Sequence, residues 1–407
     1  MALAGFAVPG VRAWGAAGHE IVATIAQIYT QPVALERACQ ILRDYDYTND
    51  YSDDTMINTE SDWQANPNNW PCHLSSIATW ADRFKYRMRW SAPLHYVGAV
   101  GDHPSDVCMF PGLDGWAGKP DINLLGGIAN TSTILLSYAD GESHNVALAQ
   151  EALKFIVHFL GDLHMPLHLT GRDRGGNGVS VCWEGRKTNF HSVWDGLVVA
   201  KAIRTVRSNY TRPLPGGFEQ VERNLKGAIY DPLIRRIIWE GVEGRWAEEV
   251  MDWVTCPGVY KKEGEEERIT VWRVLRDFFL PGWFTDEAQA PRTDTDFICP
   301  YSWAKPIHLL NCELIWPKEL ETGGSAKPRN ARCKKYPHSD SFDEEEDNGL
   351  KGEEVGEPPY ELDNPKYMGD IEKRMLLEQF LAQGGLRLAA ALNYIFGDPE
   401  GPSLHGL

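Results

Sequence analysis

Two His-x-x-x-Asp pairs constrain the fold of this chain more than any other feature of its sequence. His158 precedes Asp162, and His191 precedes Asp195. Because four residues span about one helical turn, both side chains of a pair share one helix face. One such pair could be an ordinary polar face, but two within about forty residues favour a shared metal site. The fold must therefore bring two helices together at these faces.

Three further histidines extend the candidate set. His168 follows the first pair on a turn after Pro166, which ends the helix. His95 lies in an apolar, strand-like stretch, where a lone histidine is more often a core residue than a ligand. His19 follows a run of glycines and alanines that leaves backbone room near the start of the chain. Five histidines exceed the three or four protein ligands of one zinc ion.

Asp82 and Trp14 complete the candidate set. Asp82 faces the apolar side of an amphipathic helix, and a buried carboxylate is costly unless it is paired or metal-bound. A salt bridge with Arg83 or Lys85 is the simpler explanation of Asp82 taken alone. If Trp14 is the first residue, its free amine and carbonyl can chelate a metal, with His19 closing the site. Together these residues predict a cluster of three zinc ions, a type of site that hydrolyses phosphate esters.

The overall charge argues against a nuclease that holds its substrate by counterion release. The chain has 407 residues and a formal net charge of -17. Counterion release requires a basic stripe, and none is apparent, so the metal ions would have to supply the positive charge. No run is long and apolar enough for a membrane span, and we expect a monomer.

Several features indicate secretion. Residues 1–13 are small and apolar, and Val11 and Ala13 fit the small-residue rule for cleavage, so the segment is interpreted as the remnant of a signal peptide. Eight cysteines without a Cys-x-x-Cys pair suit disulfides whose pairing the sequence leaves open. Sequons at Asn130 and Asn209 agree with secretion, although chance explains each about as well.

The apolar periodicity predicts an all-α protein with one short hairpin at 178–189, turning at Glu184-Gly185-Arg186. Residues 14–407 are expected to form a single multi-helix domain. Its insertions are predicted near 44–72, 255–300 and 320–366, the last with a solvated, acidic composition. The predicted helices span 19–29, 32–43, 74–88, 123–138, 143–164, 190–204, 217–229, 233–253, 268–279 and 368–396.

These residues resemble the type I nuclease / 3′-nucleotidase family, the secreted zinc-dependent single-strand-specific nucleases of fungi and plants, to which zinc phospholipase C is related. The most specific part is Gly-Asp-x-x-x-Pro-Leu-His followed by His-Ser-x-Trp-Asp. The resemblance covers most of 14–254, returns near 303–315 and 368–396, and implies the multi-helix fold of those proteins. The matching stretches are WGAAGHE (14–20), WADRFK (80–85), PLHYV (93–97), VHFLGDLHMPLH (157–168), GGNGVSV (175–181), NFHSVWD (189–195) and GGLRLAAALN (384–393).

The resemblance implies how the ligands divide among three Zn²⁺ ions, with Asp162 bridging the first two. The three sets would be Asp82, His95, His158 and Asp162; Trp14, His19 and Asp162; and His168, His191 and Asp195. The bridged pair would activate water for in-line attack on phosphorus, and the third ion would stabilise the departing 3′ oxygen.

The resemblance also implies roles for two residues outside the ligand set. Lys85, one helical turn from Asp82, matches the family's cation that neutralises transition-state charge, and it would act with Asp82 and Asp162 in catalysis. Tyr96 matches the aromatic residue on which a base stacks, and a duplex cannot deliver a base to such a residue without unstacking.

The chain departs from the family pattern at two positions. Gly98 stands where an acid usually hydrogen-bonds the base, with Asp102 further on, so base preference is open. Gly196 stands where Asn often follows the last aspartate. The family pattern also implies a disulfide between Cys108 and Cys312.

The leading hypothesis is a secreted endonuclease that cleaves single-stranded DNA and RNA to 5′-phosphate nucleotides and has 3′-nucleotidase activity. One alternative is a phosphodiesterase of the zinc phospholipase C type, which the loss of the acid at Gly98 permits. Another is a non-catalytic zinc-binding secreted protein whose acidic insertions block the cleft.

Overall fold

The computed structural model describes residues 15–43, 72–111, 114–119, 121–257, 293–321, 333 and 359–406. Trp14, the predicted helix 268–279 and most of the three predicted insertions lie outside these residues. Within them, no helix is both long and apolar enough to cross a membrane.

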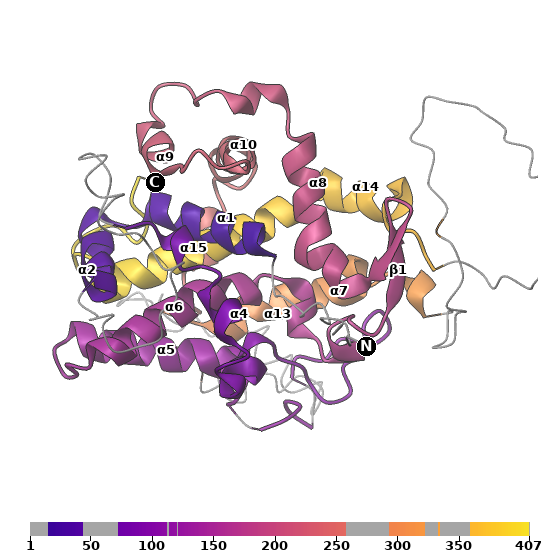
Figure 1. Cartoon of the computed structure of the whole chain (residues 1–407), viewed down its shortest axis with the longest axis horizontal. Helices are drawn as coiled ribbons and strands as arrows, with labels where there is room; N and C mark the ends of the chain where they lie inside the picture. The colour runs from indigo at the N-terminus through magenta and orange to yellow at the C-terminus, as the bar shows by residue number, and fades with distance from the viewer. Residues whose placement is uncertain are drawn as a thin grey trace, which may run out of the picture.

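The described chain is all-α apart from one small hairpin, as predicted (Figure 1). The longer helices are α1 (Ala16–Tyr29), α2 (Pro32–Arg43), α5 (Leu124–Ala139), α6 (Val146–Leu163), α8 (Val198–Thr205), α13 (Pro300–Leu310), α14 (Pro365–Arg374) and α15 (Leu376–Phe396). Short α and 3-10 segments are η2 (Leu74–Ser76), α4 (Trp80–Phe84), η3 (Arg89–His95), η4 (Pro166–Leu169), η5 (Arg172–Arg174), α7 (Phe190–Ser192), η7 (Ser208–Thr211), α9 (Glu219–Asn224), α10 (Asp231–Arg236), α11 (Val250–Val254) and η10 (Lys318–Leu320). Three segments are π-helical, namely η6 (Val193–Leu197), η8 (Ile237–Arg245) and η9 (Asn311–Ile315).

Helix α15 lies at the centre of the fold and is buried along almost its whole length. It packs against α1, α6, α2 and α5, and Figure 1 shows it running beside α1. Gly384 and Gly385 permit this approach. A Cβ atom at Gly384 would lie 3.3 Å from the Val22 side chain, and one at Gly385 would lie 2.5 Å from the Cβ of Ile25. Helix α6 is buried on all sides from Ala152 to Leu163, so the first His-Asp pair sits in the core.

The structure corrects several predicted elements. The helix predicted at 368–396 breaks at Met375, which has a left-handed φ of 54° and separates α14 from α15. The helix predicted at 74–88 is instead two short segments, η2 and α4, separated by a turn at 77–79, and Trp80 and Phe84 stack at 5.1 Å within α4. The strand-like stretch at His95 is the 3-10 segment η3, so that prediction was wrong.

The predicted hairpin is confirmed, with a shorter turn. Strands β1 (Ser180–Trp183) and β2 (Arg186–Asn189) pair antiparallel with Trp183 opposite Arg186. Glu184 and Gly185 therefore form a two-residue turn, both with positive φ as a type I′ turn requires. Arg186, predicted as a turn residue, begins β2.

All eight cysteines are paired in the structure. The implied Cys108–Cys312 disulfide is present. The other three, which the sequence left open, are Cys39–Cys72, Cys182–Cys333 and Cys256–Cys299.

His73 caps η2 in its neutral form, which makes stability depend on pH. Its Nδ1 accepts a hydrogen bond from the Ser75 amide at 3.2 Å, and its Nε2 lies 2.9 Å from the Asn224 carbonyl oxygen. Burial lowers the pKa of His73 from 6.5 to about 4, because a buried ring loses the water that stabilises its charged form.

We expect this histidine to destabilise the folded protein in mild acid. Below pH 6.5 the unfolded chain binds a proton at this ring while the folded chain does not, so stability falls as the pH drops toward 4. The loss is about 2 kcal/mol at pH 5. His73→Asn keeps a capping acceptor without titrating, so its Tm should fall less than the wild-type Tm between about pH 7.5 and pH 5. Equal falls would contradict the assignment.

Candidate metal centre

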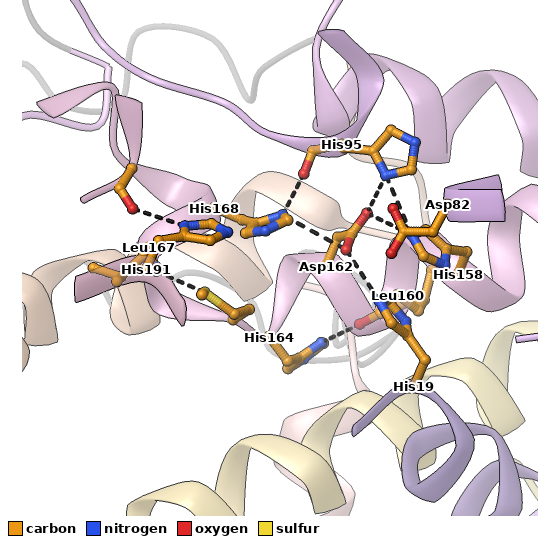
Figure 2. Close-up of polar contacts among 12 residues, drawn as sticks. His19, Asp82, His95, His158, Leu160, Asp162, His164, Leu167, His168 and His191 are labelled. Atoms are coloured by element: carbon orange, nitrogen blue, oxygen red, sulfur yellow. Dashed lines mark hydrogen bonds and ion pairs between the residues drawn. The ribbon is translucent and has the colours of Figure 1, made fainter. Parts of the chain in front are cut away.

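Asp162 lies at the centre of a buried group of imidazoles, as Figure 2 shows. On its Oδ2 side, His95 Nδ1 lies 2.9 Å away and His158 Nε2 3.3 Å away. On its Oδ1 side, His19 Nε2 lies 3.4 Å away and His168 Nδ1 3.6 Å away. The spacing of four residues in α6 directs His158 and Asp162 to the same side, as the sequence predicted.

The structure brings eight of the nine predicted ligands into three groups, in each of which one ligand atom per residue lies within 4.8 Å of the others. The groups are His19, Asp82 and His158; His95, His158 and Asp162; and His168, His191 and Asp195. The third group is the set that the resemblance implied for one ion, and the first two share His158. Trp14 lies outside the described residues, but the backbone N–H of Gly15 donates to the Asp195 carbonyl oxygen.

The second pair, His191 and Asp195, was predicted on one continuous α-helix. His191 instead lies on the single turn α7, and Asp195 lies on the π-helical segment η6. Such wide turns recur at functional sites, because they turn a side chain away from its α-helical direction. Here the turn leaves Asp195 in the group with His191.

Backbone carbonyl groups orient the imidazoles through their outer nitrogens. His158 Nδ1 lies 2.7 Å from Ala78 O, and His191 Nδ1 lies 2.8 Å from Gly175 O. The Nε2 atoms of His168 and His191 are buried and have no hydrogen-bond partner among the described residues. Metal-bound histidines show this arrangement, with one nitrogen held by a carbonyl and the other left for the metal. The residues therefore fit a metal cluster.

A glycine pair supplies one of these carbonyls. Gly175 and Gly176 both have positive φ, at 63° and 80°. A Cβ atom at Gly175 would lie 2.6 Å from Leu167 O, so only glycine lets this loop pass close enough to hold His191. This contact explains the Gly-Gly of the sequence stretch 175–181.

Burial and charge set the protonation of the group. Burial lowers the pKa of His168 to about 3 and also lowers the pKa of His191. Burial opposes charge on His158 too, but the Asp162 and Asp82 carboxylates raise its pKa to about 9. Burial alone would raise the pKa of Asp162, yet His158 and His168 hold it well below its usual value. Most rings are thus neutral near pH 7, the form that binds metal.

His164, between two ligands in sequence, points away from the cluster (Figure 2). Its Nδ1 lies 2.6 Å from Leu160 O, and its Nε2 lies 2.7 Å from an Arg387 guanidinium nitrogen. Burial and Arg387 hold the pKa of His164 well below its usual value, so the neutral ring accepts from the guanidinium. Arg387 also donates to Trp253 O at 2.8 Å. The contact between Arg387 and His164 joins α15 to the end of α6. The sequence had given no role to Arg387.

Lys85 and Tyr96 lie at the edges of the cluster. The Lys85 ammonium is 3.2 Å from Asp82 Oδ1, and its side chain is 18% exposed. Tyr96 follows the ligand His95 in an extended conformation and is 53% exposed. The roles that the resemblance implied for these two residues stay predictions.

Asp102 cannot take over the base-binding role that Gly98 lacks. Its carboxylate is buried, and it accepts from Thr170 Oγ1 at 2.5 Å and from the Met109 amide at 3.0 Å. His308 Nε2 lies 2.9 Å from the same carboxylate. Asp102 is therefore a structural tie between three segments.

Gly98→Asp is expected to destabilise the protein by about 1–3 kcal/mol through overpacking. A Cβ atom at residue 98 would lie 2.7 Å from the Gly171 amide nitrogen, so the backbone has to move. Gly196→Asn restores the family residue at the second departing position and serves as the control. No atom lies within 4 Å of a Cβ atom at residue 196. Denaturant unfolding should show a loss only for the first variant, and equal stability of both would refute the packing argument.

Comparison with known proteins identifies the family. The S1/P1 nuclease family model matches residues 14–272. Endonuclease 2 of Arabidopsis thaliana is 30% identical over 270 residues, which cover 64% of this chain and 76% of that protein. Nuclease S1 of Aspergillus oryzae is 35% identical over 189 residues, 45% of this chain and 53% of that protein. Nuclease P1 of Penicillium citrinum is 32% identical over 193 residues, 47% and 60% respectively. The resemblance noted in the sequence is confirmed, and the chain belongs to the S1/P1 nuclease family.

Proposed function

We propose that this protein is a zinc-dependent endonuclease that hydrolyses single-stranded DNA and RNA to 5′-phosphate nucleotides, with 3′-nucleotidase activity. The observation that carries the proposal is the buried Asp162 carboxylate, with four imidazole nitrogens between 2.9 and 3.6 Å from its oxygens. A set of this size exceeds the ligands of one ion and suits a cluster. Membership of the S1/P1 nuclease family supports the reaction class.

Three zinc ions would divide the ligands as the resemblance implied, with Trp14 as the ninth. The sets would be Asp82, His95, His158 and Asp162; Trp14, His19 and Asp162; and His168, His191 and Asp195. Bound zinc supplies two effects, a lowered pKa of water and stabilisation of charge on phosphoryl oxygens.

The chain's own groups prepare this chemistry. Asp162 and Asp82 supply the negative charge that holds cations in a buried site. The carbonyls of Ala78 and Gly175 fix the directions of two imidazoles before substrate binds. The Lys85 ammonium, held beside Asp82, would lie where negative charge grows on the phosphoryl group.

The preference for single strands would follow from the recessed ligands and one exposed ring. Seven of the eight described ligands are buried, whereas Tyr96 is 53% exposed. A phosphate can reach the cluster while its base stacks on Tyr96 only if that base is unpaired. Base identity would then be read weakly, because neither Gly98 nor Asp102 offers a carboxylate there.

Secretion and a monomeric state are part of the proposal. Four disulfides are typical of proteins in oxidising compartments. Both sequon asparagines, Asn130 and Asn209, are exposed. A signal peptide ending at residue 13 would free the Trp14 amine for metal binding.

The test is release of acid-soluble nucleotides from single-stranded DNA by protein that starts at Trp14, with EDTA and then with zinc restored. We expect release that EDTA stops and zinc restores, with little release from duplex DNA. Metal analysis should give about three zinc ions per chain. Zinc-loaded protein that leaves single strands intact would refute the proposal, and faster turnover of phosphatidylcholine vesicles would favour the phospholipase alternative.

A further inference from the structure

Residues 83–101 of this acidic chain include no acidic residue. The chain has 57 acidic residues in 407, but none lies between Asp82 and Asp102. The same stretch holds four cations, Arg83, Lys85, Arg87 and Arg89. The expectation of no basic stripe was therefore wrong locally, because the net charge of -17 averages over this segment.

The fold exposes the three arginines together with aromatic rings, whereas Lys85 lies beside Asp82. Between residues 83 and 96 the exposed residues are Arg83, Tyr86, Arg87, Arg89, Trp90, Ala92 and Tyr96. Six of these seven are arginines or aromatics. We call Arg83, Tyr86, Arg87, Arg89 and Trp90 the basic–aromatic patch. Tyr86 is 65% exposed and Trp90 57% exposed, a large apolar area to leave in water unless it binds a partner.

The patch is fixed relative to the metal centre. The Trp90 ring packs edge-to-face on Phe155 of α6 at 5.6 Å, and Phe155 stacks on Phe159 at 5.0 Å. The Arg87 guanidinium lies 5.7 Å from the Phe84 ring centroid. Segments α4 and η3 both pack on α6, the helix that carries His158 and Asp162. The patch is also bounded in sequence by two candidate ligands, Asp82 and His95.

We propose that the basic–aromatic patch binds the phosphates and bases of a single strand beyond the scissile phosphate, so that the enzyme grips several nucleotides at once. The arginines would pair with successive phosphates, and Tyr86 and Trp90 would stack on unpaired bases. Cations interleaved with exposed rings are the recognition chemistry of single-stranded nucleic acid. The inference rests on the proposed nuclease function and adds a second contact region to it.

The experiment compares a long and a short substrate on zinc-loaded protein. Arg87→Gln/Arg89→Gln removes two patch cations, and Tyr86→Ala removes the most exposed ring. We expect KM for a 20-nucleotide single strand to rise about tenfold, from one lost stacking or backbone contact, with kcat unchanged. Turnover of a dinucleotide, whose single phosphate is the scissile one, should stay within about twofold.

Salt dependence gives a readout that altered folding would not produce. Each lost phosphate contact should reduce the slope of log K against log salt by about 0.7. The matched control is Arg207→Gln/Arg212→Gln, which removes the same charge from the exposed connection between α8 and α9, near the top of Figure 1 and away from α4. It should leave KM and the salt slope unchanged.

The outcomes separate this inference from the proposed function. If the wild type cleaves single strands and the patch variants match it, the inference fails while the nuclease assignment stands. If the wild type does not cleave, fluorescence anisotropy with a labelled oligonucleotide still tests the patch, and patch-dependent binding supports it. Patch-dependent binding to anionic phospholipid vesicles, with oligonucleotide binding unchanged, would overturn it in favour of a membrane contact.

Discussion

Asp162→Asn is expected to lower kcat/KM on single-stranded DNA by at least about a thousandfold, or roughly 4 kcal/mol of activation free energy. The carboxylate contacts imidazoles from four different segments, and an amide removes the charge that they share. The amide NH₂ would also face nitrogens that should carry lone pairs toward a metal. Zinc content should fall by about two ions per chain, since Asp162 is the proposed bridge.

Asp195→Asn is the matched control, with the same chemical change at a ligand that is proposed to hold only one ion. It should cost about one zinc ion. Metal analysis of both variants, with folding checked by circular dichroism, decides whether Asp162 holds two ions or one. Loss of a single ion from both variants would rule out the bridging role of Asp162.

Lys85→Met should reduce kcat about a hundredfold, equivalent to roughly 2.7 kcal/mol, while zinc content stays at the wild-type value. The ammonium is 3.2 Å from Asp82 Oδ1 and contacts that ligand from the partly exposed edge of the site. A cation placed there acts on charge that develops in the transition state, so kcat should change more than KM.

Two further variants sharpen this second prediction. Lys85→Arg keeps the charge and should recover part of kcat, and Lys187→Met removes an exposed cation from β2 and should have no effect. If Lys85→Met instead loses zinc in proportion to activity, the lysine supports Asp82 and takes no direct part in the reaction.

The candidate ligands could be predicted because their spacing is local. In α6 a separation of four residues fixes the shared direction of His158 and Asp162 whatever surrounds the helix. His95 could not be predicted with the same rule, since the apolar alternation around it serves a 3-10 turn and not a strand. The π-helical turn at Asp195 likewise depends on packing that no local pattern encodes.

Contacts between distant segments account for what the sequence did not predict. Three of the four disulfides, the tie between Asp102 and His308, and the contact between His164 and Arg387 join residues far apart in the chain. The basic–aromatic patch was missed for another reason. Its residues are visible in the sequence, but only the fold shows that the arginines and rings point outward together.

The position of α15 has a consequence for biosynthesis. This helix is formed by residues 376–396, which leave the ribosome long after α1 and α6, yet it packs against both of them. Until it emerges, Arg387 cannot brace the end of α6, and α1 and α6 lack the central partner that aligns their histidines. A nascent chain without α15 therefore carries the chemical groups of the centre without their arrangement, and a competent enzyme forms only after α15 has emerged.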